Sequence, residues 1–232
     1  MGRPGTAASG FDAWARTYEH SALQSTLFIP AQEGALRLAQ RLMARPRRVL
    51  DVGCGTGRLL RQARQRYPLA ELVGVDVAWG MLAAATAATR VELAVRFVRA
   101  PVERLPFPPR VFDLVFATMS VRHWTDAPAG IDQIGRVLAP GGVFVLADVF
   151  PARRRRRRRH AELPAELAAA LGAGGLRVVS LDRASWFRLP DIQVVAASRP
   201  PAATGAPWRR PPRRRPSAAG AAGRAGTGRW SR

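Results

Sequence analysis

Short apolar runs alternate with amphipathic stretches along most of the chain. Each apolar run is short enough for a buried strand, and the stretches between the runs repeat their apolar positions at helical spacing. The predicted strands are 49–52, 71–76, 95–99, 112–117 and 143–148, and the predicted helices are 31–44, 58–65, 79–89, 127–138 and 164–171. Strands that alternate with helices in this way predict an α/β fold with a mostly parallel, doubly wound sheet.

Both ends of this pattern add elements. Two further apolar runs, 175–182 and 191–197, predict a hairpin-like antiparallel edge. The sheet is therefore expected to be Rossmann-like, with seven strands and an antiparallel C-terminal edge strand. At the other end Phe11, Trp14 and Tyr18 recur at helical spacing. They predict an N-terminal helical segment over 11–45 that either docks on the domain or closes over a ligand as a lid.

Composition separates one domain from two tails. Residues 1–10 are rich in Gly, Ala and Pro and are predicted to be disordered, 11–198 form the domain, and 199–232 form a basic, disordered tail. The formal net charge of +21 would suit a nucleic acid or an anionic surface. Much of that charge lies in the run 153–159 and in the tail, and the chain contains no Lys. Nucleic acid is thus a partner that the sequence permits but does not favour.

Cysteine content and hydropathy bear on the compartment. Cys54 is the only cysteine, so no intramolecular disulfide can form, and a reducing cytoplasm is the simplest location. No apolar run is long enough to span a bilayer, and no metal site is expected. The sequence predicts a cytoplasmic protein without a transmembrane segment.

The strongest chemical signal is the glycine-rich turn that follows the first predicted strand. Gly53 to Gly57 have the pattern G-x-G-x-G and lead into a helix, which is typical of a turn whose backbone approaches a ligand. Asp76 ends the second strand, where a carboxylate can bind a ribose diol. Because the carboxyl ends of parallel strands meet at one edge of the sheet, Thr118 and His123 are expected to lie near this turn.

Several motifs in order resemble the class I S-adenosylmethionine (SAM) methyltransferase superfamily, in particular its small-molecule and quinone-biosynthesis members. The resemblance extends over about 11–200. The motifs are Val49-Leu-Asp-Val-Gly-Cys-Gly-Thr-Gly57, Gly74-Val-Asp76, Glu103-Arg-Leu-Pro-Phe107, Phe112-Asp-Leu-Val115, Arg122-His-Trp124 and Arg136-Val-Leu-Ala-Pro-Gly-Gly142. The resemblance implies SAM as cofactor and transfer of its methyl group, by in-line displacement, to a small organic or lipophilic acceptor.

The resemblance also implies roles for individual residues. Asp51 would hold the ammonium group of SAM and Asp76 the ribose hydroxyls, while His123 is the candidate general base. The full set of expected cofactor-binding residues is Tyr18, Asp51, Gly53, Cys54, Gly55, Thr56, Gly57, Asp76, Val77, Met81, Val102, Glu103 and Thr118. One position departs from the family pattern, because Pro101 stands where an acid commonly accepts a hydrogen bond from the adenine amine.

Two other functions remain open at this stage. An NAD(P)-dependent oxidoreductase would use a similar strand, turn and helix, but its usual pattern is G-x-G-x-x-G, and Asp51 would repel a pyrophosphate. A basic protein that binds nucleic acid or an anionic surface, with a degenerate methyltransferase fold, would explain the run 153–159 and Pro101. The acceptor, the methylated atom and the oligomeric state are not determined by the sequence.

Overall fold

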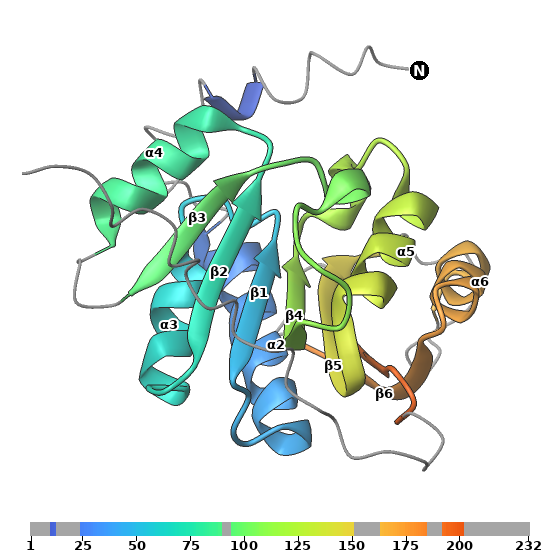
Figure 1. Cartoon of the computed structure of the whole chain (residues 1–232). Coiled ribbons are helices and arrows are strands. Elements are labelled where there is room, and N and C mark those ends of the chain that lie inside the picture. Colours follow the sequence, from blue (N-terminus) through green and yellow to red (C-terminus); the bar gives the residue numbers. More distant parts are fainter. Residues whose placement is uncertain (1–9, 13–23, 90–93, 151–162, 185–191, 202–232) are drawn as a thin grey trace, which may run out of the picture. The chain divides into compact units, whose positions relative to one another are not determined.

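The computed structural model describes residues 10–12, 24–89, 94–150, 163–184 and 192–201. They form one α/β domain built on a twisted sheet with helices on both faces (Figure 1). The strands are β1 (Arg48–Val52), β2 (Glu71–Asp76), β3 (Val95–Arg99), β4 (Phe112–Thr118), β5 (Leu138–Val149), β6 (Arg177–Arg183) and β7 (Ile192–Ser198). The helices are α2 (Ile29–Leu42), α3 (Arg58–Arg66), α4 (Trp79–Ala88), α5 (Ala127–Val137) and α6 (Ala165–Ala173), with single turns η1 (Gln24–Phe28), η3 (Val102–Arg104) and η4 (Val121–His123).

The sheet has seven strands in the order β3-β2-β1-β4-β5-β7-β6. Strands β1 to β5 are parallel, and β7 is antiparallel to both of its neighbours. The predicted fold class, with its antiparallel C-terminal strand, is confirmed. β7 lies between β5 and β6, so that β6 occupies the edge itself.

The two faces of the sheet are covered by different helices. Alternate strand residues such as Val49 and Leu114 pack with α2, α3 and Leu82 of α4. Their neighbours in sequence, such as Leu50 and Val115, face the other way and pack with α5 and α6. Because both faces are buried, the central strands read as continuous apolar runs in the sequence.

Some boundaries differ from the prediction. Strand β5 begins at Leu138, which pairs with Phe112, and the Pro140-Gly-Gly142 segment lies within it rather than before it. Arg199 belongs to the domain and not to the tail, because its backbone N–H donates to Gly142 and its carbonyl accepts from Gly141. The predicted disordered segment 1–10, the arginine run and the tail beyond 201 lie almost entirely outside the described residues.

Within the described ranges, no helix has both the length and the apolar character needed to cross a membrane. The same ranges contain no group of three or more His, Cys, Asp or Glu side chains placed to hold a metal ion.

Candidate cofactor-binding site

The glycine turn is fixed to the carboxyl end of β2. The N–H groups of Gly53 and Cys54 both donate to the carbonyl of Val75, at 2.8 and 3.0 Å. Gly53 has φ +71°, and a Cβ there would come within 2.6 Å of the Cβ of Ser120. Only glycine meets both conditions, so the turn can lie close against the loop after β4.

Asp76 connects the turn to the start of α4. Its Oδ2 accepts from the Gly55 N–H at 2.8 Å, and its Oδ1 accepts from the Ala78 N–H at 2.9 Å. Burial raises the pKa of Asp76, while these backbone hydrogen bonds oppose the rise. The carboxylate is therefore held in one orientation at the edge of the cavity, as a ribose-binding acid requires.

Asp51 lies under the turn and is 1 % exposed. Burial raises the pKa of Asp51 to about 8, and the nearby carboxylate of Asp76 adds to the rise. Its Oδ1 has no hydrogen-bond partner within the described part of the chain. A buried acceptor without a partner is costly, and a cationic ligand group above the turn would relieve that cost.

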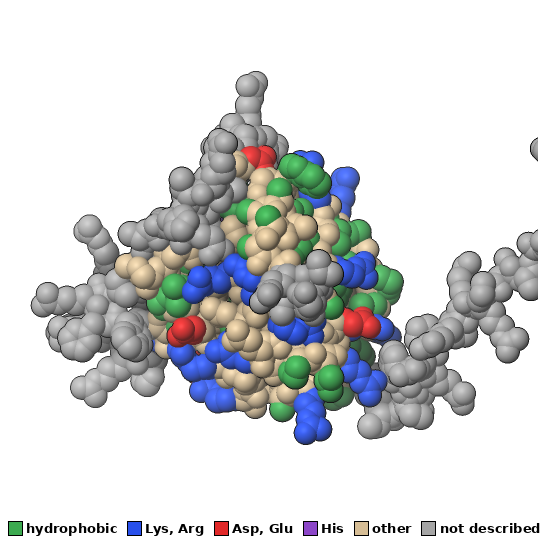
Figure 2. Space-filling model, turned by 90° about the vertical axis from the view of Figure 1, so that its left-hand side faces the viewer, with side chains coloured by type: hydrophobic (Ala, Val, Ile, Leu, Met, Phe, Trp, Pro, Cys, Tyr) green, Lys and Arg blue, Asp and Glu red, His purple; other side chains and the backbone are tan. Residues whose placement is uncertain are grey.

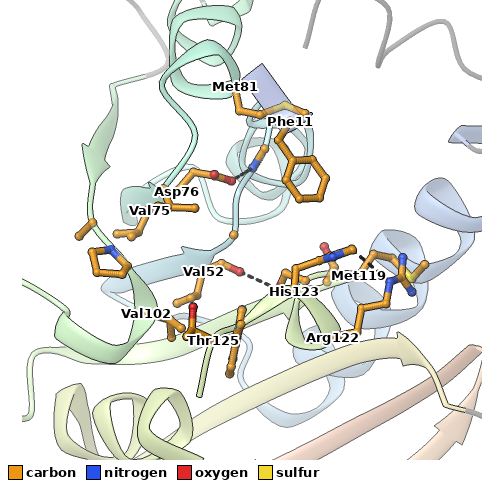
Figure 3. Close-up of a pocket in the computed structure, with 18 of the residues that line it drawn as sticks. Phe11, Val52, Val75, Asp76, Met81, Val102, Met119, Arg122, His123 and Thr125 are labelled. Atoms are coloured by element: carbon orange, nitrogen blue, oxygen red, sulfur yellow. Dashed lines mark hydrogen bonds between the residues drawn. The ribbon is translucent and has the colours of Figure 1, made fainter. Parts of the chain in front are cut away.

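A cavity of about 330 Å³ opens beside these residues at the carboxyl ends of β1, β2 and β4. Figure 3 shows Asp76 and Phe11 on one side of it and Arg122 with His123 on another. The lining is Phe11, Leu27, Phe28, Val52, Gly53, Gly55, Val75, Asp76, Val77, Met81, Ala100, Pro101, Val102, Glu103, Thr118, Met119, Ser120, Arg122, His123, Trp124 and Thr125. Its mostly apolar character with a few polar groups is typical of a small-molecule site.

Most of the expected site residues line this cavity. Those that do are Gly53, Gly55, Asp76, Val77, Met81, Val102, Glu103, Thr118 and His123. Asp51, Cys54, Thr56 and Gly57 do not line it, and Tyr18 lies outside the described residues. The Cys54 thiol packs within 4 Å of where a Cβ on Gly74 would lie, Thr56 is 2 % exposed, and a Cβ on Gly57 would meet the Phe97 ring. These three residues shape the turn from the side of the core.

Glu103 binds the protein's own backbone. Its Oε1 accepts from the N–H groups of Thr125 and Asp126, at 3.0 and 3.1 Å, and so holds the loop before α5. Pro101 beside it lines the cavity without offering an acceptor side chain. The end of the cavity where the resemblance places adenine is therefore more apolar than the family pattern implies.

Arg122 joins two groups that the sequence did not connect. Its Nη1 donates to Oδ1 of Asp148 at 2.8 Å, and its Nε donates to Nε2 of His123 at 3.2 Å. Asp148 is 1 % exposed; burial raises its pKa and Arg122 opposes the rise. Burial and Arg122 both lower the pKa of His123, so its imidazole is neutral at pH 7.

The sequence assigned no role to Asp148 and none to the Arg122 side chain beyond a family motif, and it placed Phe11 only in a segment that docks on the domain or closes over a ligand. Asp148 could have been found, because it lies one residue before the end of β5, near the same edge of the sheet as Asp76 at the end of β2. The edge of the Phe11 ring contacts the His123 ring, with centroids 5.0 Å apart, and no spacing rule predicts a contact between such distant positions. Asp12 next to it accepts from the Gly80 N–H at 2.6 Å, so the described N-terminal residues 10–12 lie against α4.

Comparison with known proteins bears on the functions left open. Residues 50–146 match the family described as methyltransferase domain, and this match covers the glycine turn, Asp76 and β4. Residues 50–146 thus carry a methyltransferase domain, and solved SAM-dependent methyltransferases share its fold. The NAD(P)-dependent oxidoreductase is therefore set aside.

Two relatives and one solved structure illustrate the similarity. A demethylmenaquinone methyltransferase of Thermus thermophilus is 40% identical over 107 residues, which are 46% of this chain and 49% of that protein. A malonyl-[acyl-carrier protein] O-methyltransferase of Halorhodospira halophila is 35% identical over 144 residues, or 61% and 47%. A Haloferax volcanii complex of the Trm112 methyltransferase activator and a methyltransferase matches with TM-score 0.66 and 20% identity, covering 82% of this chain and 97% of that one. The chain spans about half the length of the curated relatives it matches.

The residues present in this methyltransferase domain suit SAM. Asp51 lies beneath the glycine turn with a partnerless Oδ1, although it does not line the cavity, and Gly53 and Gly55 leave the edge of the cavity free of side chains. Asp76 is fixed by two backbone N–H donors. The pyrophosphate of a dinucleotide would bring no positive charge to the buried Asp51 and would oppose its ionisation.

Proposed function

We propose that the chain transfers the methyl group of SAM to a small organic or lipophilic acceptor by in-line displacement. The observation that carries this proposal is the apolar cavity that has the fixed carboxylate of Asp76 at its edge and the partnerless Asp51 beneath the turn. Bound SAM supplies an electrophilic methyl group on a sulfonium. The protein has to align the two reactants and exclude water, and it needs no acid for the leaving thioether.

Three residues would hold the donor. Asp76 would bind the ribose hydroxyls, and Asp51 would bind the ammonium directly or through water; both lie at or next to the carboxyl ends of their strands. Val102 lies at the start of η3 and lines the cavity, so its backbone N–H is available to the adenine edge. Pro101 provides no side-chain hydrogen bond there, and adenine is held mainly by apolar contact.

The acceptor would occupy the part of the cavity lined by apolar side chains and by His123. Phe11, Leu27, Met119 and Trp124 supply the apolar walls. The named relatives act on demethylmenaquinone and on malonyl-[acyl-carrier protein], so a ring carbon and a carboxylate oxygen are the two methylated atoms to test first.

His123 is proposed as the general base when the acceptor must lose a proton. Its lowered pKa leaves the imidazole neutral near pH 7, which a base requires. Nε2 accepts from Arg122 in the structure, so an acidic acceptor oxygen that takes over the Arg122 donor would find Nε2 ready to accept its proton. An acceptor that is already anionic would not need His123.

Calorimetry with S-adenosylhomocysteine tests the donor site. Binding should be saturable, and Asp76→Ala should weaken it at least tenfold, because a charge-assisted hydrogen bond is lost. Glu71→Ala is a matched control, since Glu71 begins the same strand, at the end away from the cavity, and its side chain is 72% exposed. Binding of NAD in place of S-adenosylhomocysteine would contradict the proposal.

Mass spectrometry identifies the acceptor. The chain is incubated with SAM and with a demethylquinone or a malonyl thioester, and the products are searched for a gain of one methyl group. The proposal also places the protein in the cytoplasm, supported by the single buried cysteine, which needs no oxidising compartment.

A further inference from the structure

An exposed tryptophan lies close in the sequence to residues that line the cavity. Trp79 is the first residue of α4, two residues after the cavity-lining Val77. Trp79 is 63% exposed and Val77 45%. Large apolar side chains grouped on a surface commonly mark a contact site, and these two adjoin the opening to the apolar interior.

Cationic side chains stand beside this apolar pair. Arg99 ends β3 opposite Asp76, and its Nε donates to the carbonyl of Val77 at 3.1 Å. Arg96 is also exposed on this edge strand, but its side chain is on the other face of the sheet. Figure 2 shows that arginine predominates among the charged side chains on the face that carries α4 and β3, with apolar side chains next to it.

The acids near the rim are engaged by backbone donors. Asp76 accepts from Gly55 and Ala78, and Asp12 accepts from Gly80 at the start of α4. Both carboxylates accept from the domain's own N–H groups, although Asp12 is exposed, and Arg99 is the exposed cation beside Trp79 and Val77. An aromatic side chain with flanking cations suits the interface of an anionic bilayer, where the ring lies at headgroup level and the guanidinium meets phosphate.

We propose that the rim formed by Val77, Trp79 and Arg99 docks the cavity mouth on an anionic lipid bilayer. The proposal rests on the proposed function, because a lipophilic acceptor would then pass from the bilayer into the cavity without crossing water. An acidic carrier protein is the competing occupant. The bilayer is favoured because of Trp79. An indole side chain partitions into the membrane interface without needing a complementary pocket on a partner protein.

Vesicle binding of the full-length chain tests the docking surface. Vesicles of phosphatidylcholine with phosphatidylglycerol are compared with vesicles of phosphatidylcholine alone, by co-sedimentation. Trp79→Ser should lower partitioning onto the anionic vesicles about tenfold. Leu69→Ser is the matched control. Leu69 is 96% exposed, but it precedes β2 and so lies at the opposite end of that strand from Asp76 and the cavity. The basic segments outside the described residues are the same in both variants and contribute equally.

The cationic part of the rim is tested in the same assay. Arg99→Gln should lower partitioning about fivefold, and Arg45→Gln, an exposed residue before β1, should lower it less. Equal losses in the rim variants and their controls would overturn the proposal. It would also be overturned if none of the proteins co-sedimented with vesicles while the unaltered chain bound an acidic protein. Calorimetry with S-adenosylhomocysteine on each variant keeps this result separate from the proposed function: intact cofactor binding without vesicle binding refutes the docking surface alone.

Discussion

The buried carboxyl of Asp51 should make the protein less stable as the pH rises. Burial and Asp76 raise the pKa of Asp51 from 3.8 to about 8 in the folded state. Between these two values the folded chain holds a proton that the unfolded chain has released. Stability contributed by this group is complete below about pH 4 and is lost progressively up to about pH 8.

The size of the effect follows from linkage. Each unit of pKa difference corresponds to about 1.4 kcal/mol. At pH 7 the group therefore costs on the order of 4 kcal/mol, which is a large share of a typical folding free energy of roughly 5–15 kcal/mol. Asp51→Asn removes the titration. The free energy of unfolding of the variant should rise relative to the natural protein by about 1.4 kcal/mol for each pH unit between about 5 and 8.

Urea unfolding of both proteins at four pH values in that window measures this difference. Any pH-independent penalty of the new amide shifts the variant curve by a constant and leaves the slope of the difference unaffected. Two parallel pH profiles would refute the reasoning, because they would show that Asp51 ionises alike in the folded and unfolded chains. The same variant should bind S-adenosylhomocysteine at least tenfold more weakly, since an amide offers the ammonium no charge.

Two further predictions concern the turn and the adenine end of the cavity. Gly57→Ala should destabilise the fold by about 2 kcal/mol or more, because φ is +74° and the new Cβ would lie 2.8 Å from the Phe97 ring. Gly55→Ala, with nothing within 4 Å of its Cβ, should cost clearly less in the same thermal unfolding experiment, and equal losses would contradict this packing argument. Pro101→Asp should tighten S-adenosylhomocysteine binding roughly tenfold or more, since φ −72° and ψ 150° suit Asp; an unchanged Kd would show that adenine does not reach this position.

The sequence predicted the fold well because the sheet is buried on both faces. Each central strand is then a short apolar run bounded by glycine or acid, and the helices between them have one apolar stripe. The start of β5 was missed for a physical reason. Residues 138–142 contain Pro and Gly and resemble a turn, yet Leu138 pairs with Phe112 and Arg199 pairs with Gly142. Pairing between distant segments decides where such a strand begins, and that pairing cannot be read from the local composition.

The site was predictable where a residue's position on its strand decides its surroundings. Asp76 ends β2 and therefore lies at the ligand edge. The direction of side chains within the turn was less predictable. The Cys54 side chain points into the core, whereas its neighbour Gly53 lines the cavity. The backbone changes direction here because Gly53, Gly55 and Gly57 have left-handed φ angles. The contact between Phe11 and His123 depends on how the N-terminal residues lie on the finished domain.

Two buried carboxyl groups, Asp51 and Asp148, differ in whether a cation is close to them. Both carboxyls end up 1 % exposed, and burial raises the pKa of each. Asp148 has Arg122 at 2.8 Å, which opposes the rise. For Asp51, burial and Asp76 both raise its pKa. One oxygen of each acid, Oδ1 of Asp51 and Oδ2 of Asp148, lacks a hydrogen-bond partner in the described chain. A buried acid of this kind is stabilised when a ligand supplies the positive charge, so binding of an ammonium group near pH 7 should release a proton from Asp51.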